Sequence, residues 1–218
     1  MNWLALDTAT SRASVAVGSS VDDAVEESLD GARQHARALL PMVTRVLERR
    51  GVTAAALDGV IVADGPGSFT GLRVAAAFAK ALLDVRSLPL RTAPSLLARA
   101  LAAAGPGETV MTAADALRSE HYAAVYRFPA GRVETLAAPR VVPSAALIEL
   151  AAAFGARVAG DAPPRAAWLL ELLGREGGTS AVGNVQSWEP VYGRPAEAQA
   201  KWEREHGRAL SDPAGAAG

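Results

Sequence analysis

Residues 64–73, with the sequence DGPGSFTGLR, carry the residue types best suited to chemistry in this chain. They follow a short apolar run at 60–63 and open a long alanine-rich segment, an order that predicts a strand, a tight glycine turn and a helix. The glycines let the backbone adopt positive φ angles and approach another surface closely. Because a helix start also attracts anions, the turn predicts either a nearby phosphate or carboxylate, or a close backbone contact.

A second candidate lies at residues 7–10 (DTAT), directly after the first apolar run. Its carboxylate and hydroxyl oxygens suit Mg²⁺ and phosphate, although a simple Asx-type turn is favoured for the segment taken alone. The functional interpretation gains because both segments follow strands, at the edge where α/β proteins bind ligands. The candidate phosphate or nucleotide contacts are Asp7, Thr8, Gly67, Ser68, Thr70 and Arg73.

Other familiar chemistries do not match. Arg73 could hold a phosphate or a partner's carboxylate, or it could simply be solvated. The glycine turn lacks the Gly-Lys-Ser/Thr of a Walker loop. His35, His121 and His206 are isolated in the sequence, and neither a His-x-x-x-His pair nor a Gly-x-Ser-x-Gly elbow occurs. These patterns argue against a zinc peptidase, and no metal ligands are expected.

Composition bounds the remaining classes. The 218 residues allow one large domain or two small ones, and half of them are apolar, which excludes a disordered chain. A net charge of -1 argues against strong unaided binding of nucleic acid. The absence of cysteine removes disulfides and thiolate chemistry. No signal peptide or membrane-length apolar span is recognisable, so we expect a soluble, cytoplasmic protein.

Hydrophobic periodicity predicts the elements that position these residues. In the first half we expect strands at 4–6, 13–17, 25–29, 57–63 and 88–92 and helices at 34–50, 71–83 and 94–104. Pro41 either kinks the first helix or marks its first turn. The helix at 71–83 is apolar all round, which is typical of a helix buried on all sides, so its outer face needs a cover from this chain or from a partner.

Gly105-Pro106-Gly107 is the best candidate for a domain boundary. Beyond it we expect strands at 109–115, 121–128, 133–142 and 157–160 and helices at 143–153 and 166–173. The predicted division is therefore a first lobe at 1–104, a smaller second lobe at 105–202 and a disordered tail at 203–218.

Several stretches together resemble the TsaB (YeaZ) family, and the likeness runs from the start of the chain to about Arg194. They are residues 7–10 (DTAT), 34–36 with 40–43 (QHA and LPMV), 65–73 (GPGSFTGLR), 115–122 (DALRSEHY) and 190–194 (PVYGR). The resemblance implies an α/β, two-lobed actin-like ATPase fold (ASKHA, RNase H-like). It also implies an accessory subunit for N6-threonylcarbamoyladenosine synthesis at A37 of tRNA. An older label for the superfamily is M22 glycoprotease.

The resemblance further implies its partners: a catalytic TsaD-type paralogue, a TsaE-type ATPase, a second copy when the chain is alone, and tRNA only through the complex. The catalytic paralogue carries a metal-binding histidine pair where this chain has Ser95 and Arg99. The second phosphate turn of an active actin-like ATPase falls at residues 115–118, which contain no glycine. We therefore expect no catalysis and no bound cofactor in the chain alone, with ATP or ADP and metal held by the partner subunits.

In this family the helices of the first lobe pack against the partner's equivalent helices, and we expect the same here. The predicted interface residues are Leu39, Met42, Val43, Val46, Ala76 and Lys80. A Val43→Asp variant is then expected to lose its partner while staying folded. Two alternatives remain: a standalone actin-like enzyme, either a small-molecule kinase or an M22-type metallopeptidase, and a nucleic-acid-binding module, against which the near-neutral charge argues.

Overall fold

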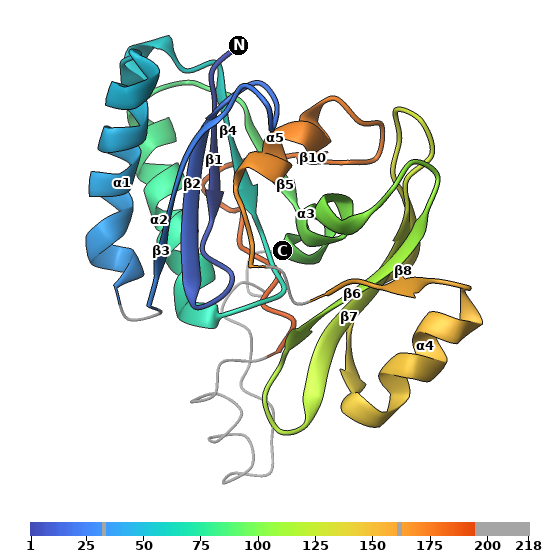
Figure 1. The fold of residues 1–218 in the computed structure, drawn as a ribbon. Coiled ribbons are helices and arrows are strands. Elements are labelled where there is room, and N and C mark those ends of the chain that lie inside the picture. The colour runs from blue at the N-terminus through green and yellow to red at the C-terminus, as the bar shows by residue number, and fades with distance from the viewer. Residues whose placement is uncertain (32–33, 161–162, 195–218) are drawn as a thin grey trace, which may run out of the picture.

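The computed structural model describes residues 1–31, 34–160 and 163–194, which form two β-sheets with helices on their faces (Figure 1). The first sheet has the spatial order β10-β5-β4-β1-β2-β3. Its strands are β1 (Trp3–Asp7), β2 (Arg12–Gly18), β3 (Val25–Asp30), β4 (Gly59–Ala63), β5 (Leu90–Ala93) and β10 (Ser180–Ala181). The β1–β2–β3 meander is antiparallel, whereas β4 pairs in parallel with both β1 and β5.

Alternation along the central strands divides the first core between the two faces of this sheet. Leu4 and Leu6 pack with α1 (His35–Arg50) and α2 (Phe69–Val85). Trp3 and Ala5 point the other way and pack with α3 (Ser95–Ala103) and α5 (Ala167–Leu173). Both faces of the sheet are therefore covered by helices, which explains why β1 and β4 are buried along their whole length.

The second sheet has the order β8-β7-β6-β9. Its strands are β6 (Thr109–Asp115), β7 (Glu120–Arg127), β8 (Glu134–Pro143) and β9 (Arg157–Val158). Helix α3 lies between the two sheets, because its side chains share one core with Val110 and Tyr126 of the second sheet. Helix α4 (Leu147–Ala153) covers the opposite face, where Leu150 packs with Met111 and Val125.

Short 3₁₀ turns at Ala54–Ala56 and Ser144–Ala146 precede β4 and α4. The second turn displaces the start of the expected 143–153 helix, because β8 continues as far as Pro143. Helix α1 runs from His35 to Arg50, so Pro41 lies in its interior and not in its first turn. None of the described helices has both the length and the apolar character needed to cross a bilayer.

The chain returns to the first sheet after the second one is complete. The predicted division placed residues 105–202 together, but α5 packs on β1, β2 and β4, and β10 pairs with β5. The amide N–H of Ala166 donates to Ser14 Oγ and that of Ala167 to Glu26 Oε1, which fixes the start of α5 on the meander. The six-stranded sheet is thus completed by residues distant in sequence. The predicted disordered tail at 203–218 lies outside the described residues.

The predicted partner interface requires a correction. Its apolar members on α1 and α2 lie in the interior of this chain, each less than 5% exposed: Leu39, Met42, Val43, Val46 and Ala76. The four residues of α1 belong to the core between these helices and the sheet, and Ala76 of α2 is buried as well. Lys80 donates to Glu189 Oε1 at 3.0 Å and to the carbonyl of Gln186 at 3.1 Å. Periodicity located the buried face of each helix, but that face is turned toward the chain's own sheet.

The outer flank of α2 is covered in part by residues 182–194, which we call the strap. Val182, Val185 and Trp188 pack against the core under α2, and Gln186 Nε2 donates to Asp84 Oδ1 at 3.2 Å. The expectation that α2 is buried on all sides was wrong, because Ala77 and Ala81 are exposed. The cover that the apolar helix required thus comes from this chain on one flank only.

Replacing Val43 by Asp is expected to unfold the chain, contrary to the sequence-based expectation that the variant stays folded. The change would bury a carboxylate with no partner, at a cost of at least about 3 kcal/mol. Urea unfolding would measure the loss. The control is Thr44→Asp at the neighbouring exposed position, which should stay within about 0.5 kcal/mol of the wild type. Equal stability of the two variants would contradict the assignment of Val43 to the core.

Candidate functional site

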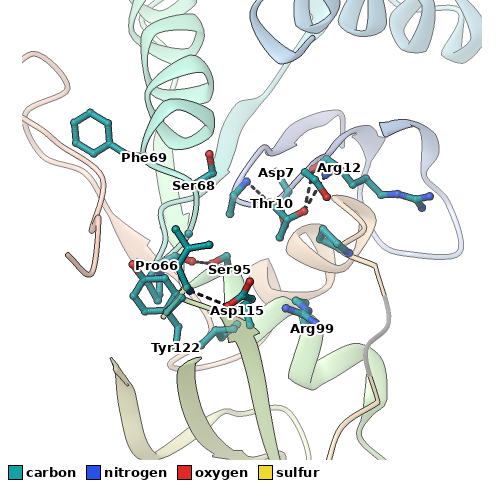
Figure 2. A pocket seen from close by; sticks show the side chains of 18 of the residues that line it. Asp7, Thr10, Arg12, Pro66, Ser68, Phe69, Ser95, Arg99, Asp115 and Tyr122 are labelled. Atoms are coloured by element: carbon teal, nitrogen blue, oxygen red, sulfur yellow. Dashed lines mark hydrogen bonds between the residues drawn. The ribbon is translucent and has the colours of Figure 1, made fainter. Parts of the chain in front are cut away.

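A cleft of about 1060 Å³ lies between the two lobes. One wall comes from the β1–β2 turn and from the glycine turn before α2, and the opposite wall comes from α3 and the β6–β7 hairpin (Figure 2). Two further segments complete the lining: residues 163–164, which precede α5, and residues 192 and 194 at the end of the strap. This is the edge at which the parallel strands β1, β4 and β5 end, as the sequence predicted.

The glycine turn and the β1–β2 turn are held together by backbone contact. A Cβ on Gly67 would lie 2.3 Å from the carbonyl oxygen of Ala9, and one on Gly71 would lie 2.0 Å from that of Thr8. Only glycine allows this approach. The amide of Ser68 donates to the Ala9 carbonyl at 2.7 Å, and the Thr8 hydroxyl donates to the Gly71 carbonyl at 2.7 Å. Of the two roles left open for these glycines, the close backbone contact is the one that the structure contains.

The first glycine of the turn faces the strap. Gly65 has a φ of +114°, and a Cβ there would lie 2.1 Å from the carbonyl oxygen of Val191. The Val191 amide donates to the Asp64 carbonyl at 2.7 Å, and the Ser95 hydroxyl donates to the Pro66 carbonyl at 2.6 Å. The turn is therefore fixed on one side by the strap and on the other by α3.

Asp7 lies at the end of β1 and is completely buried. Its Oδ1 accepts the amide N–H of Ala9 at 3.0 Å, the two-residue contact of an Asx turn. Its Oδ2 has no hydrogen-bond partner among the described residues. Burial raises the pKa of Asp7 to about 6, although the Ala9 amide and the charge of Arg99 act in the opposite direction. A carboxyl group in this state exchanges its proton close to neutral pH.

The predicted phosphate contacts do not converge on one point. Asp7, Gly67, Ser68 and Thr70 line the cleft, whereas the Thr8 hydroxyl is engaged behind it by Gly71. Ser68 caps α2 by accepting the Gly71 amide at 3.2 Å. The Arg73 guanidinium lies over the ring of Phe69, which lines the cleft, but Arg73 itself does not belong to the described lining. As arranged, these groups do not fit a phosphate cradle, because several of them already bind within the chain.

The hairpin between β6 and β7 forms the facing wall. The resemblance placed the second phosphate turn of an active ATPase here, and no site residue was predicted in it. Leu117, Arg118 and Ser119 all have positive φ angles, of 64°, 57° and 60°. Non-glycine residues adopt this left-handed conformation at a cost and seldom in succession. The tip is held by the amide of Leu117, which donates to Asp115 Oδ1 at 2.8 Å, and by Ser144, whose amide and hydroxyl both donate to the Ser119 carbonyl. The side chain of Leu117 is 64% exposed at the cleft.

The two residues at the expected positions of the paralogue's metal ligands have other surroundings here. Ser95 binds the glycine turn through its hydroxyl, and Arg99 lines the cleft close enough to Asp7 to lower its pKa. Across residues 1–31, 34–160 and 163–194, no cluster of three or more His, Cys, Asp or Glu side chains could hold a metal ion.

An Asp7→Asn variant should change the pH dependence of stability. The folded pKa of Asp7 is raised above its unfolded value, so folding binds a proton, and stability falls as pH rises from about 4 to 6. A shift from 3.8 to about 6 corresponds to about 3 kcal/mol. Urea unfolding at pH 4 to 7 should show the wild type losing stability relative to Asp7→Asn over this range. Asp22→Asn, at an exposed position, controls for loss of a charge, and a constant difference between wild type and Asp7→Asn would contradict the assignment.

A Ser119→Gly variant should be more stable than the wild type by about 0.5–1 kcal/mol. Glycine adopts the φ of 60° without the energetic cost that a Cβ brings, and the larger conformational entropy that glycine loses on folding offsets part of this gain. Thermal unfolding would measure the difference. Ala130→Gly, in the neighbouring turn where φ is not positive, should instead lose stability. A loss of stability in Ser119→Gly would show that the tip is not strained.

Comparison with known proteins agrees with this architecture. The family model of TsaD, tRNA N6-adenosine threonylcarbamoyltransferase, matches residues 30–161. The curated TsaB of Haemophilus influenzae, a tRNA threonylcarbamoyladenosine biosynthesis protein, is 36% identical over 56% of this chain and 52% of its own length. The Escherichia coli TsaB is 33% identical over 58% of this chain and 55% of its own length. The Bacillus subtilis TsaB is 27% identical over 78% of this chain and 84% of its own length. In the first two matches the chain spans about half the length of the curated relative.

Among solved structures, YeaZ from Pseudomonas aeruginosa superposes with a TM-score of 0.71 at 27% identity, covering 88% of this chain and 99% of that one. A second structure, described as similar to peptidase YEAZ from the same organism, superposes with a TM-score of 0.71 at 28% identity, covering 88% of this chain and 99% of that one. These matches confirm the predicted two-lobed actin-like α/β fold. Because the family model covers more than half of the chain and the relatives carry the TsaB and YeaZ names, the chain belongs to the TsaD-type family, in its TsaB (YeaZ) branch.

Proposed function

We propose that this chain is an accessory subunit in the biosynthesis of N6-threonylcarbamoyladenosine in tRNA. It binds a TsaD-type paralogue that carries out the reaction, and a TsaE-type ATPase joins the two. The names of the relatives support a role in threonylcarbamoyladenosine biosynthesis. The near-neutral charge supports contact with tRNA through the complex and not by the chain alone.

The observation that carries the proposal is an uncovered surface on α1 and α2, which we call the helical face. Its residues are exposed or half-buried and mostly small or apolar: Ala36, Leu40 and Thr44 of α1, and Val74, Ala77, Phe78 and Ala81 of α2. Leu40, the large apolar residue of α1 in this face, is 62% exposed. The two helices pack against each other on the same side of the first sheet, and among the described residues the strap covers α2 on one flank.

The character of this face suits a pair of helices from a related protein. Alanines let two backbones approach closely, and a large exposed apolar side chain at the centre is typical of a docking surface. The face replaces the buried residues that the sequence had assigned to the interface, and it lies directly above them. The same surface is the one expected to pair two copies of this chain in the absence of the paralogue.

In this proposal the partner subunits hold ATP or ADP and the metal. The glycine turn supports this division, because the Ser68 amide donates to the Ala9 carbonyl and the Gly71 amide donates to Ser68 Oγ. The hairpin tip supports it as well: Leu117 projects where an actin-like ATPase has a glycine-rich phosphate turn.

The test is co-purification with the TsaD-type paralogue of the same organism. Leu40→Asp and Ala77→Asp should each abolish the complex, because a charge would be buried at the centre of the interface, and neither should prevent the free chain from folding. Ile148→Asp, at an 80% exposed position on α4, serves as the control and should bind normally. A complex that survives both helical-face variants would refute this interface.

A standalone enzyme is the competing function, and one structural neighbour is described as similar to a peptidase. The purified chain should hydrolyse neither ATP nor peptides at rates above a heat-inactivated sample. Steady turnover by the chain alone, lost in Asp7→Asn, would favour the enzyme over the accessory subunit.

A further inference from the structure

We propose that Arg73 is a preformed anchor for a carboxylate group on the partner protein; this inference rests on the function proposed above. The Arg73 guanidinium carbon lies 5.1 Å from the centroid of the Phe69 ring. On the strap, Tyr192 stacks on Phe69 with ring centroids 4.5 Å apart and planes tilted by 40°. An arginine held over an aromatic ring loses less freedom on binding than one that is free in solvent.

The aromatic pair is itself fixed by polar contacts. The Tyr192 hydroxyl donates to Glu189 Oε2 at 2.9 Å, and Lys80 donates to Glu189 Oε1 at 3.0 Å. The contacts therefore run without interruption from Lys80 through Glu189 and Tyr192 to Phe69 and Arg73. They tie the strap to α2 at Phe69 and at Lys80 and set the position of the guanidinium.

Arg73 differs from most arginines of the chain. Ten of the arginines in the described part form ion pairs with Asp or Glu. Arg73 is exposed, and within the described residues no carboxylate lies at ion-pair distance from it. Glu189 lies close enough for the charge of Arg73 to help lower its pKa, but its two carboxylate oxygens bind Lys80 and Tyr192. A guanidinium that makes no ion pair within the described residues can accept an acid supplied from outside.

Its position places this group at the rim of the helical face. Arg73 and Ala77 are one helical turn apart on α2, and both are exposed. Phe69 and Tyr192 reach the lining of the interlobe cleft, whereas Arg73 does not belong to the described lining. Arginine and tyrosine next to a small, apolar surface are the residue types that dominate binding energy at protein interfaces.

A guanidinium also binds phosphate, so an RNA backbone is the other chemistry to weigh. The acids Asp84 and Glu189 lie on the same flank of α2, and Glu189 is 60% exposed at its side chain. They would repel an RNA backbone, which carries several phosphates along the helix, more strongly than a single carboxylate placed at Arg73. A single carboxylate beside an apolar contact is the better match to this surface.

The experiment measures the affinity of the full chain for the purified TsaD-type paralogue at low and high salt. Arg73→Glu should weaken binding about tenfold or more, and Arg73→Lys should weaken it less, because lysine keeps the charge but loses the fork and the stacking. Arg140→Glu, at an exposed position on β8, should bind as the wild type does. Reversal of the matching acid on the partner to arginine should restore the binding of Arg73→Glu.

Unchanged melting temperatures would show that Arg73→Glu acts on binding, and Arg73→Gln provides a second variant if the charge reversal destabilises the chain. If the wild type fails to bind the paralogue, the proposed function falls. If the wild type binds the paralogue and Arg73→Glu and Arg73→Gln bind it as tightly as the wild type does, only the anchor is refuted. Arg73→Glu could also bind the paralogue fully while the assembled complex no longer retains tRNA. That result would overturn the carboxylate anchor in favour of a phosphate contact.

Discussion

The rest of the first lobe depends on the backbone contact between the glycine turn and the β1–β2 turn. Gly67 and Gly71 allow the carbonyl oxygens of Ala9 and Thr8 to lie where a Cβ would otherwise stand. This contact sets the start of α2 against the end of β1, and therefore the angle at which α2 crosses the sheet. The same contact engages the amide of Ser68 and the hydroxyl of Thr8. A motif that resembles a phosphate loop has become a structural joint between two turns.

Asp7 stands directly before the two residues that make this contact. It is fully buried, and burial raises its pKa to about 6. One oxygen keeps the Asx-turn contact with Ala9 while the other has no partner among the described residues. A buried polar atom without a partner is costly, so this residue type is not explained by the stability of the turn alone.

Local pattern predicted the strands, the helices and the position of the glycine turn, because alternation and helical periodicity depend on neighbours in sequence. It could not say which structure covers a helix. The periodic stripe of Leu39, Val43 and Val46 marks a buried face equally well for a partner or for the chain's own sheet, and it is the sheet that covers it. The pairing of β10 with β5 and the path of the strap depend on contacts about 90 or more residues apart. The left-handed tip at Leu117–Ser119 had no signal either, since none of its residues is glycine.

The strap gives the two surfaces of the molecule a common support. It lies along α2, where Gln186 binds Asp84 and Glu189 binds Lys80. It then passes the glycine turn at Gly65 and ends at β7, where Arg194 pairs with Glu120 beside the strained hairpin. One short segment therefore contacts the flank of the helical face, the joint between the turns and the second lobe. The strap therefore borders both surfaces, although the helical face and the described lining of the cleft share no residue.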